Sequence, residues 1–222
     1  MSKTSRKNVS RKNKNSKKNV KYYSRKNKIN IMRGGVKLDE TLLTRIREND
    51  PTLTELRLIG NDFGDAGATA IAEALKRNTT LTILDISMNN IRDAGATAIA
   101  EALKVNTTLT KLIIDQNLIR DAGAKALAEA LKINKTLTSL YIRENNIGNS
   151  GAIAIARALD FNATLTSLAI RSKSFNIDNE GVKAFAEVLK YNTTLTDLTL
   201  FFPNDHINSE LKNEIDKYIK KK

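Results

Sequence analysis

Residues capable of catalysis or ligand chemistry are few in this sequence. Among its 222 residues there is no cysteine, and the single histidine is His206. Thiolate nucleophiles, disulfides and the Cys/His sites typical of structural zinc are therefore excluded. No phosphate-binding glycine loop or nucleophile elbow occurs either. The sequence predicts no catalytic residue, no metal site and no bound cofactor.

A second chemical motif, the glycosylation sequon Asn-x-Thr, recurs at regular spacing. It begins at Asn78, Asn106, Asn134, Asn162 and Asn192. Sequons in such number are typical of a secreted glycoprotein, but no apolar run that would predict a secretory signal precedes them. We interpret them as structural: the Asn takes the left-handed conformation that ends a helix, and the Thr opens the next turn.

Positive charge is the third chemical feature, and it is confined to one segment. The net charge is +13, and residues 1–33 hold thirteen Lys or Arg and no acid, so the remainder of the chain is neutral. This segment repeats Ser-(Arg/Lys)-Lys-Asn without a periodic apolar face, which predicts a disordered arm. The residues expected to make its electrostatic contacts are Arg6, Lys7, Arg11, Lys12, Lys14, Lys17, Lys18, Arg25 and Lys26.

Four roles suit such an arm. Its basic clusters are typical of a nuclear import signal. They also suit phosphate contacts with nucleic acid, with Tyr22 and Tyr23 stacking on bases. Attraction to an anionic membrane surface is a third role, and a solubilising tail is the fourth. All four stay open at the level of sequence.

A 28-residue repeat reveals the elements that must position the other side chains. Each block begins L-x-x-L-x-L-x-x-N-x-L, as from Leu81, and this alternation predicts a short strand followed by a tight turn. The second half of each block changes to helical spacing. The first block shows the resulting apolar stripe at Ala68, Ile71, Ala72 and Leu75.

One strand-turn-helix unit cannot bury its own apolar face, so successive units must stack. The stack predicts an α/β solenoid, a horseshoe with a parallel sheet on the concave side and helices on the convex side. We expect Leu84, Leu112 and Leu140 to lie in one continuous core. Asp65 and Asp93 are expected to cap the helices that they begin.

Three parts are predicted along the chain. Residues 1–33 form the disordered arm, residues 34–52 an N-terminal capping helix, and residues 53–222 six repeats, the last of which acts as the C-terminal cap. No stretch approaches the ~18 consecutive apolar residues that a membrane span requires. We expect an intracellular, cytoplasmic monomer, with entry into the nucleus through the arm as an alternative.

The repeat resembles the ribonuclease-inhibitor class of leucine-rich repeats. Its phrase D-A-G-A-x-A-I-A-E-A-L-K-x-N-T-T-L-T-x-L is similar to repeats of NOD-like receptors. The resemblance implies a curved horseshoe that presents its sheet to partner proteins. Ran GTPase-activating proteins share this fold, which leaves an activator role open, although no residue here matches that role. The arm, with Met32-Arg33-Gly34-Gly35 at its end, resembles arms on proteins of large DNA viruses of protists.

Recognition is expected on the strand half of each repeat. The third, fifth and seventh strand positions alternate with the inward leucines and face the concave surface. They vary between repeats, whereas the helix residues hardly change. The pairs Arg57–Asp85 and Asp115–Arg143 are expected to form across neighbouring strands. The candidate partner-binding residues are Arg57, Asp85, Ile113, Asp115, Tyr141, Arg143, Arg171 and Phe201.

The sequence therefore favours a non-catalytic protein-interaction module that binds a protein partner on its concave sheet. The alternative is a binder of nucleic acid or anionic membrane driven by the arm, with the solenoid as a scaffold. A third interpretation is that the sheet residues bind no partner, because a solvated face with modest cross-strand ion pairs has the same composition.

Overall fold

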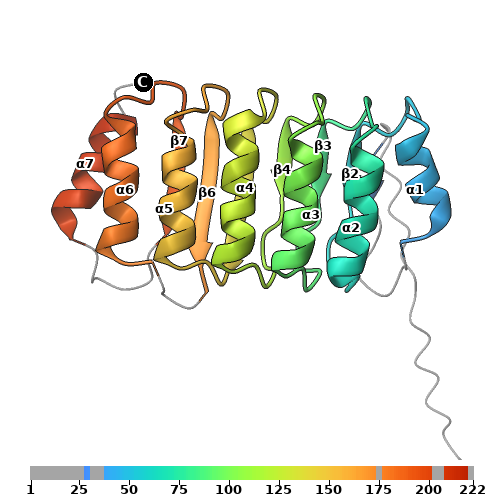
Figure 1. Ribbon diagram of the computed structural model, residues 1–222, viewed down its shortest axis with the longest axis horizontal. Helices are drawn as coiled ribbons and strands as arrows, with labels where there is room; N and C mark the ends of the chain where they lie inside the picture. The colour runs from blue at the N-terminus through green and yellow to red at the C-terminus, as the bar shows by residue number, and fades with distance from the viewer. Residues whose placement is uncertain (1–27, 31–37, 174–176, 202–207, 220–222) are drawn as a thin grey trace, which may run out of the picture.

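The computed structural model describes residues 28–30, 38–173, 177–201 and 208–219. Strands and helices alternate along the chain, and the strands form one parallel seven-stranded sheet in sequence order (Figure 1). The strands are β1 (Lys28–Asn30), β2 (Glu55–Arg57), β3 (Ile83–Asp85), β4 (Lys111–Ile113), β5 (Ser139–Asn145), β6 (Ser167–Ser172) and β7 (Asp197–Phe201). The helices are α1 (Glu40–Arg47), α2 (Gly64–Leu75), α3 (Asp93–Leu103), α4 (Asp121–Ile133), α5 (Asn149–Ala158), α6 (Asn179–Leu189) and α7 (Ser209–Ile219).

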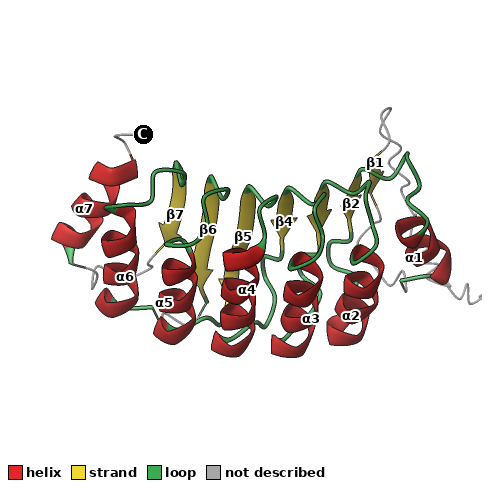
Figure 2. Cartoon of the chain, turned by 45° about the horizontal axis from the view of Figure 1, so that its top comes forward, coloured by secondary structure: helices red, strands yellow, loops and turns green. Residues whose placement is uncertain are grey.

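The helices stand in a row along one face of the sheet (Figure 2). The opposite face carries no helix from the described part of the chain. This is the two-layer α/β solenoid that the repeat predicts, because a parallel strand pair needs a crossover and each crossover here is one helix on the same side.

A continuous apolar core lies between the two layers. Leu84, Leu112 and Leu140 are fully buried and occupy equivalent places in the register of β3, β4 and β5. The helix stripe represented by Ile71 and Leu75 packs against them and is also buried. The predicted spine of stacked leucines is confirmed.

Both ends of the described solenoid are closed by a helix with one apolar face. In α1, Leu42, Leu43 and Ile46 are buried, and Asp39 caps its start by accepting the N–H of Leu42 at 2.7 Å. In α7, Ile215 is buried and the neighbouring apolar residues are partly covered. An apolar face turned inward and a charged face turned outward are what a terminal coil requires.

Strand β1 is a difference from the expected organisation. It pairs in parallel with β2, and its three residues belong to segment 1–33, which was predicted as a disordered arm. The remainder of that segment lies outside the described residues, as does His206.

The asparagines of the sequons are buried but do not adopt the left-handed conformation that the sequence analysis assigned. At the end of α4, Asn134 has φ of −66°. Its amide nitrogen donates to the carbonyls of Leu103 and Asn106 in the preceding coil at 2.7 and 3.0 Å. Its amide oxygen accepts the N–H of Leu137 at 2.7 Å. The side chain therefore links two coils and closes the turn, so the structural interpretation holds with a different mechanism.

A second asparagine ladder, formed by Asn89, Asn117 and Asn145, runs through the strand halves of three consecutive coils. Asn117 is fully buried and donates to three backbone carbonyls, one of them that of Ile86 in the preceding coil at 3.2 Å. Its oxygen accepts the N–H groups of Asn89 and Ile91, both at 3.0 Å. The buried amide of Asn117 is tolerated because both its nitrogen and its oxygen have partners.

Asp65 and Asp93, which were expected to cap their own helices, cap the next helix instead. Asp65 Oδ1 accepts from the N–H groups of Arg92 and Gly95 at 2.7 and 2.9 Å, which lie at the start of α3. No side-chain hydrogen bond caps α2 itself. The prediction was wrong in this respect because the acceptor and donors come together only when coils stack.

Candidate functional site

The face of the sheet without helices is the candidate site, and we call it the sheet face. It is formed by the third, fifth and seventh strand positions of successive repeats. Parallel register places these positions side by side, for example Asp85 beside Ile113 and Ile113 beside Tyr141. Inward leucines alternate with them, so their side chains are held on a rigid scaffold.

At the N-terminal end of the sheet face, two carboxylates bind the guanidinium of Arg57. The Arg57 guanidinium donates from Nε to Glu55 Oε1 at 2.6 Å, and its Nη1 lies 3.6 Å from Asp85 Oδ2. Both carboxylates are buried, at 6% and 4% exposure, and Asp85 also accepts from the hydroxyl and N–H of Ser87. The predicted Arg57–Asp85 pair is confirmed, but Glu55 is the closer partner.

The second predicted pair, Asp115 with Arg143, has tighter geometry. Arg143 donates from Nε and Nη2 to Asp115 Oδ2 at 2.9 and 2.6 Å, and its backbone N–H donates to Oδ1 at 2.6 Å. The hydrogen bond to this carboxylate raises the pKa of Arg143 above its usual value. Asp115 is buried, so the arginine is held in one orientation on a fixed anion.

Tyr141 lies in the middle of the sheet face, and two cations approach its ring. Lys111 Nζ is 4.7 Å and Arg143 Cζ is 5.5 Å from the centre of its ring. Its hydroxyl accepts from Ser167 Oγ at 3.3 Å. Both cations are within the distance at which a ring quadrupole attracts them. With half-exposed Ile113 beside it in the register, Tyr141 forms an amphipathic patch that we call the tyrosine patch.

Two residues of this surface were missed by sequence reasoning. Lys111 belongs to the third strand position, one strand before Tyr141 and diagonal to it, and a search of diagonal neighbours would have found it. Glu144 lies near the end of β5, where the register with β6 shifts between Ile142 and Asn145, and it binds Arg171, with 2.6 Å between Oε1 and Nε. Its φ of 55° is a left-handed conformation, which no strand pattern indicates.

The predicted residues do not form one compact site. Arg57 and Asp85 lie in β2 and β3, and Arg171 and Phe201 lie in register in β6 and β7, at the other end of the sheet. Ile113, Tyr141, Asp115 and Arg143 are the group that the structure brings together. The predicted arm contacts, Arg6, Lys7, Arg11, Lys12, Lys14, Lys17, Lys18, Arg25 and Lys26, lie outside the described residues.

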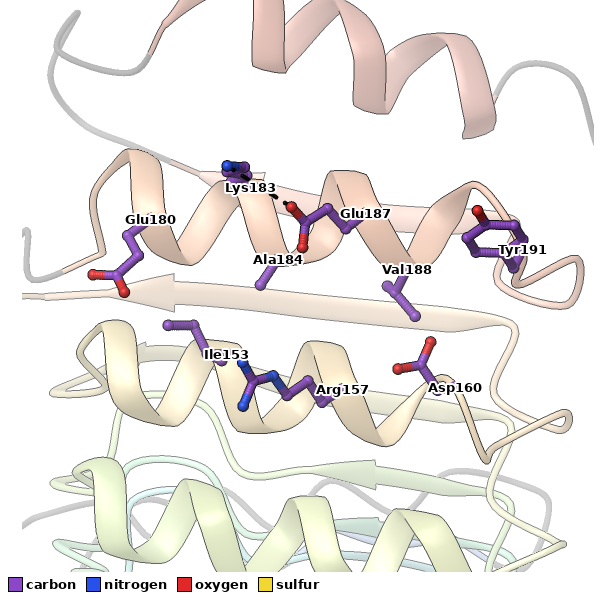
Figure 3. Close-up of a pocket in the computed structure, with 9 residues that line it drawn as sticks. All are labelled: Ile153, Arg157, Asp160, Glu180, Lys183, Ala184, Glu187, Val188 and Tyr191. Atoms are coloured by element: carbon purple, nitrogen blue, oxygen red, sulfur yellow. Dashed lines mark ion pairs between the residues drawn. The ribbon is translucent and has the colours of Figure 1, made fainter.

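The described ranges contain no group of three His, Asp or Glu side chains that could hold a metal ion. A hollow between α5 and α6, on the helix side of the molecule, mixes Ile153 and Val188 with Arg157, Asp160 and Glu180 (Figure 3). It is a shallow groove between packed helices and is separated from the sheet face by the core.

Comparisons with known proteins agree with this architecture. Residues 35–142 match the TMOD/LMOD leucine-rich domain, and residues 134–156 match a leucine-rich repeat. The domain is a leucine-rich repeat solenoid. The resemblance to leucine-rich repeats is thereby confirmed, whereas the finer likenesses to the ribonuclease-inhibitor class, to NOD-like receptors and to viral arms remain predictions.

Two solved structures resemble this leucine-rich repeat chain over most of their length. One is titled Leiomodin-1 Actin-Binding Site 2, with 26% identity and a TM-score of 0.54 over 84% of this chain and 92% of that one. The other is the tropomodulin C-terminal domain of Caenorhabditis elegans, with 14% identity and a TM-score of 0.52 over 82% and 90%. The second likeness shows the fold alone. No curated protein matches the sequence.

Among the helices in the described ranges, none is long and apolar enough to cross a membrane.

Proposed function

We propose that this leucine-rich repeat chain is a non-catalytic protein-binding module, and that the tyrosine patch of its sheet face is the centre of the binding surface. The observation that carries the proposal is the approach of Lys111 and Arg143 to the ring of Tyr141 on a sheet face without helices. Tyr and Arg are the residue types that dominate the energetics of protein interfaces.

Preorganisation supports the same surface. The Arg143 side chain is fixed by two hydrogen bonds to Asp115, so little side-chain entropy is lost when a partner covers it. The Lys111 ammonium has no carboxylate partner among the described residues and lies over the ring of Tyr141. It can therefore pair with an acidic group of the partner. A partner surface with a carboxylate beside an apolar side chain would complement this patch.

Actin is the first candidate for the partner. The argument is the likeness to the structure titled Leiomodin-1 Actin-Binding Site 2, which covers most of both chains. That title names what leiomodin-1 binds, and the 26% identity transfers it to this chain as a proposal only.

The test measures the affinity of the full chain for monomeric actin by titration calorimetry. We expect Tyr141→Ala to weaken binding about tenfold or more, as removal of an interface hot spot does. Lys125→Ala is the matched control, because Lys125 is an exposed cation of α4 on the helix side. If actin binds the Tyr141→Ala variant as tightly as the original chain, the sheet face is the wrong surface. If actin does not bind at all, the partner is wrong, and affinity purification with the same variant pair then tests the surface alone.

The alternative carried by the arm makes a separate prediction. Thirteen cations without an acid would bind nucleic acid through phosphates, and an affinity that depends on ~6–10 such contacts falls by roughly 10³–10⁵ between 50 and 200 mM salt. A salt titration of nucleic-acid binding, with and without charge-neutralising substitutions at Lys12, Lys14, Lys17 and Lys18, decides this role. If neither the salt concentration nor the substitutions change the affinity for nucleic acid, this role of the arm is excluded.

A further inference from the structure

A row of exposed apolar side chains follows the edge of the solenoid at the C-terminal ends of the helices. It consists of the residue immediately before the buried asparagine of four consecutive repeats. The exposures are 58% for Val105, 53% for Ile133, 64% for Phe161 and 82% for Tyr191. We call these four residues the apolar row. They are the large hydrophobic residues that the described part of the chain leaves exposed.

The asparagine ladder next to the apolar row fixes its alignment. Asn134 Nδ2 donates to the carbonyl of Asn106 at 3.0 Å, and Asn162 and Asn192 each donate to the carbonyl of the preceding ladder asparagine at 3.2 Å. Each member of the row is bonded directly to one of these buried residues. The four side chains are therefore held along one edge, one per coil, and form a repeated surface feature. Single exposed apolar residues need no explanation, but an ordered row does.

Cations surround the apolar row. We define the rim as the two residues before each ladder asparagine and the one after it, from Asn78 to Asn192. Asp160 is the one acid among these positions. The bases are Lys76, Arg77, Lys104, Lys132, Lys135 and Lys190.

Four of the six cations form surface ion pairs. Lys76, Lys104 and Lys132 each contact a glutamate three residues earlier, at 2.6, 2.6 and 2.7 Å, and Lys190 contacts Glu214 at 3.3 Å. Surface pairs of this kind contribute little to stability, and their lysines can exchange the glutamate for an anionic surface. Lys135 Nζ donates to the carbonyl of Phe161 at 3.0 Å, and Lys132 Nζ lies 5.8 Å from the Phe161 ring. Positive charge therefore lies directly against the aromatic tip.

We propose that this rim docks on an anionic lipid surface, with the apolar row inserted at the level of the headgroups and the lysines beside the phosphates. Aromatic tips together with long basic side chains suit the membrane interface, where rings lie at headgroup level and lysine stems extend to the polar layer. The thirteen bases of segment 1–33 supply the second attraction that stable peripheral binding needs.

A lipid surface fits this edge better than a protein groove does. The row members stand at separate turns, each more than half exposed, and are not gathered around a hollow. The hollow between α5 and α6 includes one member of the row, Tyr191, together with Asp160 of the rim (Figure 3), and a hollow between α4 and α5 reaches the rim at Lys132 without a member of the row. A fluid bilayer accepts a line of separate tips without requiring a complementary shape.

Fluorescence provides the first test, because the chain contains no tryptophan. Tyr191→Trp introduces a single probe into the rim of the full chain. We expect its emission to shift to the blue, and to be quenched by brominated lipid, with vesicles of phosphatidylcholine and phosphatidylserine. Arg120→Trp, at the opposite ends of the helices, is the matched control and should remain unquenched. Equal quenching of both probes, or of neither, would overturn the proposal.

Vesicle sedimentation provides the second test. We expect Phe161→Ser with Tyr191→Ser to lower the partition of the full chain onto the same vesicles about tenfold or more, because two aromatic side chains no longer insert. Ala94→Ser with Ala122→Ser is the control at the opposite edge and should have no effect. Unchanged partition of the first variant would assign any lipid binding to the arm and refute the rim. If the original chain does not bind vesicles, the proposal is also refuted, and a protein partner becomes the candidate for the apolar row.

Discussion

Asp93 and Gly123 belong to consecutive coils and meet at the start of α4. The Asp93 carboxylate oxygen Oδ1 accepts the backbone N–H of Gly123 at 2.8 Å. The same oxygen would lie 2.8 Å from a Cβ atom added to that glycine. One short contact therefore explains two recurring residues of the repeat: the aspartate provides the cap, and the glycine provides the room for it.

The first prediction concerns the cap. Asp93→Ala should lower the free energy of unfolding by about 1–2 kcal/mol, because the N–H groups of Arg120 and Gly123 both lose their acceptor. Asp93→Asn should have a smaller effect, since Asn149 accepts from the next coil in the equivalent position at 2.9 Å. Urea denaturation measures both. Equal losses in the two variants would show that the charge, and not the hydrogen bond, provides the stabilisation.

The second prediction concerns the glycine. A Cβ at Gly123 would also lie 2.8 Å from Ile119 Cγ2 and 3.0 Å from Ala96 Cβ. Gly123→Ala should therefore destabilise the protein by about 1–3 kcal/mol, even though alanine favours a helix. Ala122→Ser, on the exposed neighbour, should change stability by less than about 0.5 kcal/mol. A thermal melt in which Gly123→Ala is as stable as the original chain would contradict the close approach of the coils.

The third prediction compares two asparagines at the same position of the ladder. Asn117→Ala should cost about 3 kcal/mol or more, because several buried backbone groups lose a partner together. Asn61 is similarly buried, but its side-chain amide has no partner among the described residues. Asn61→Ala should therefore cost clearly less. Denaturant unfolding measures both losses, provided that the m-values of the variants are equal. If Asn117→Ala and Asn61→Ala lose the same stability, the hydrogen bonds of the ladder do not provide it.

The fourth prediction concerns pH. The Asp50 carboxylate accepts the hydroxyl and N–H of Thr52 at 2.6 and 2.8 Å and the Arg45 Nε at 2.6 Å. These hydrogen bonds, those from Thr52 first, lower the pKa of Asp50 from 3.8 to about 2. A depressed carboxyl pKa stabilises the folded state above the unfolded value and loses that effect as the pH falls.

The stability difference between the original chain and Asp50→Asn should accordingly be constant above about pH 4 and shrink as the pH falls toward 2. Denaturant unfolding of both proteins across this range measures it. A difference that does not change with pH would show that the Asp50 carboxylate is not responsible.

Much of the candidate site could also be predicted from the sequence. The strand positions alternate with period two, so the side chains sharing the sheet face follow from counting, and both cross-strand pairs were expected. The second cation at the Tyr141 ring was not expected, because Lys111 reaches the ring diagonally from the preceding strand. Nor was the contact of Glu144 with Arg171, because Glu144 has a left-handed conformation within β5 that no strand pattern indicates.

The sequence by itself determined the repeat, the buried leucines and the order of strand and helix. Each coil packs between similar coils, so the same pattern of apolar and polar residues recurs about every 28 residues. Only the tertiary structure decided what the polar residues do. Asp65 caps the following helix, and Asn134 binds carbonyls of the preceding coil. Donor and acceptor in these bonds are about one repeat apart along the chain, so their pairing exists only after the coils have stacked.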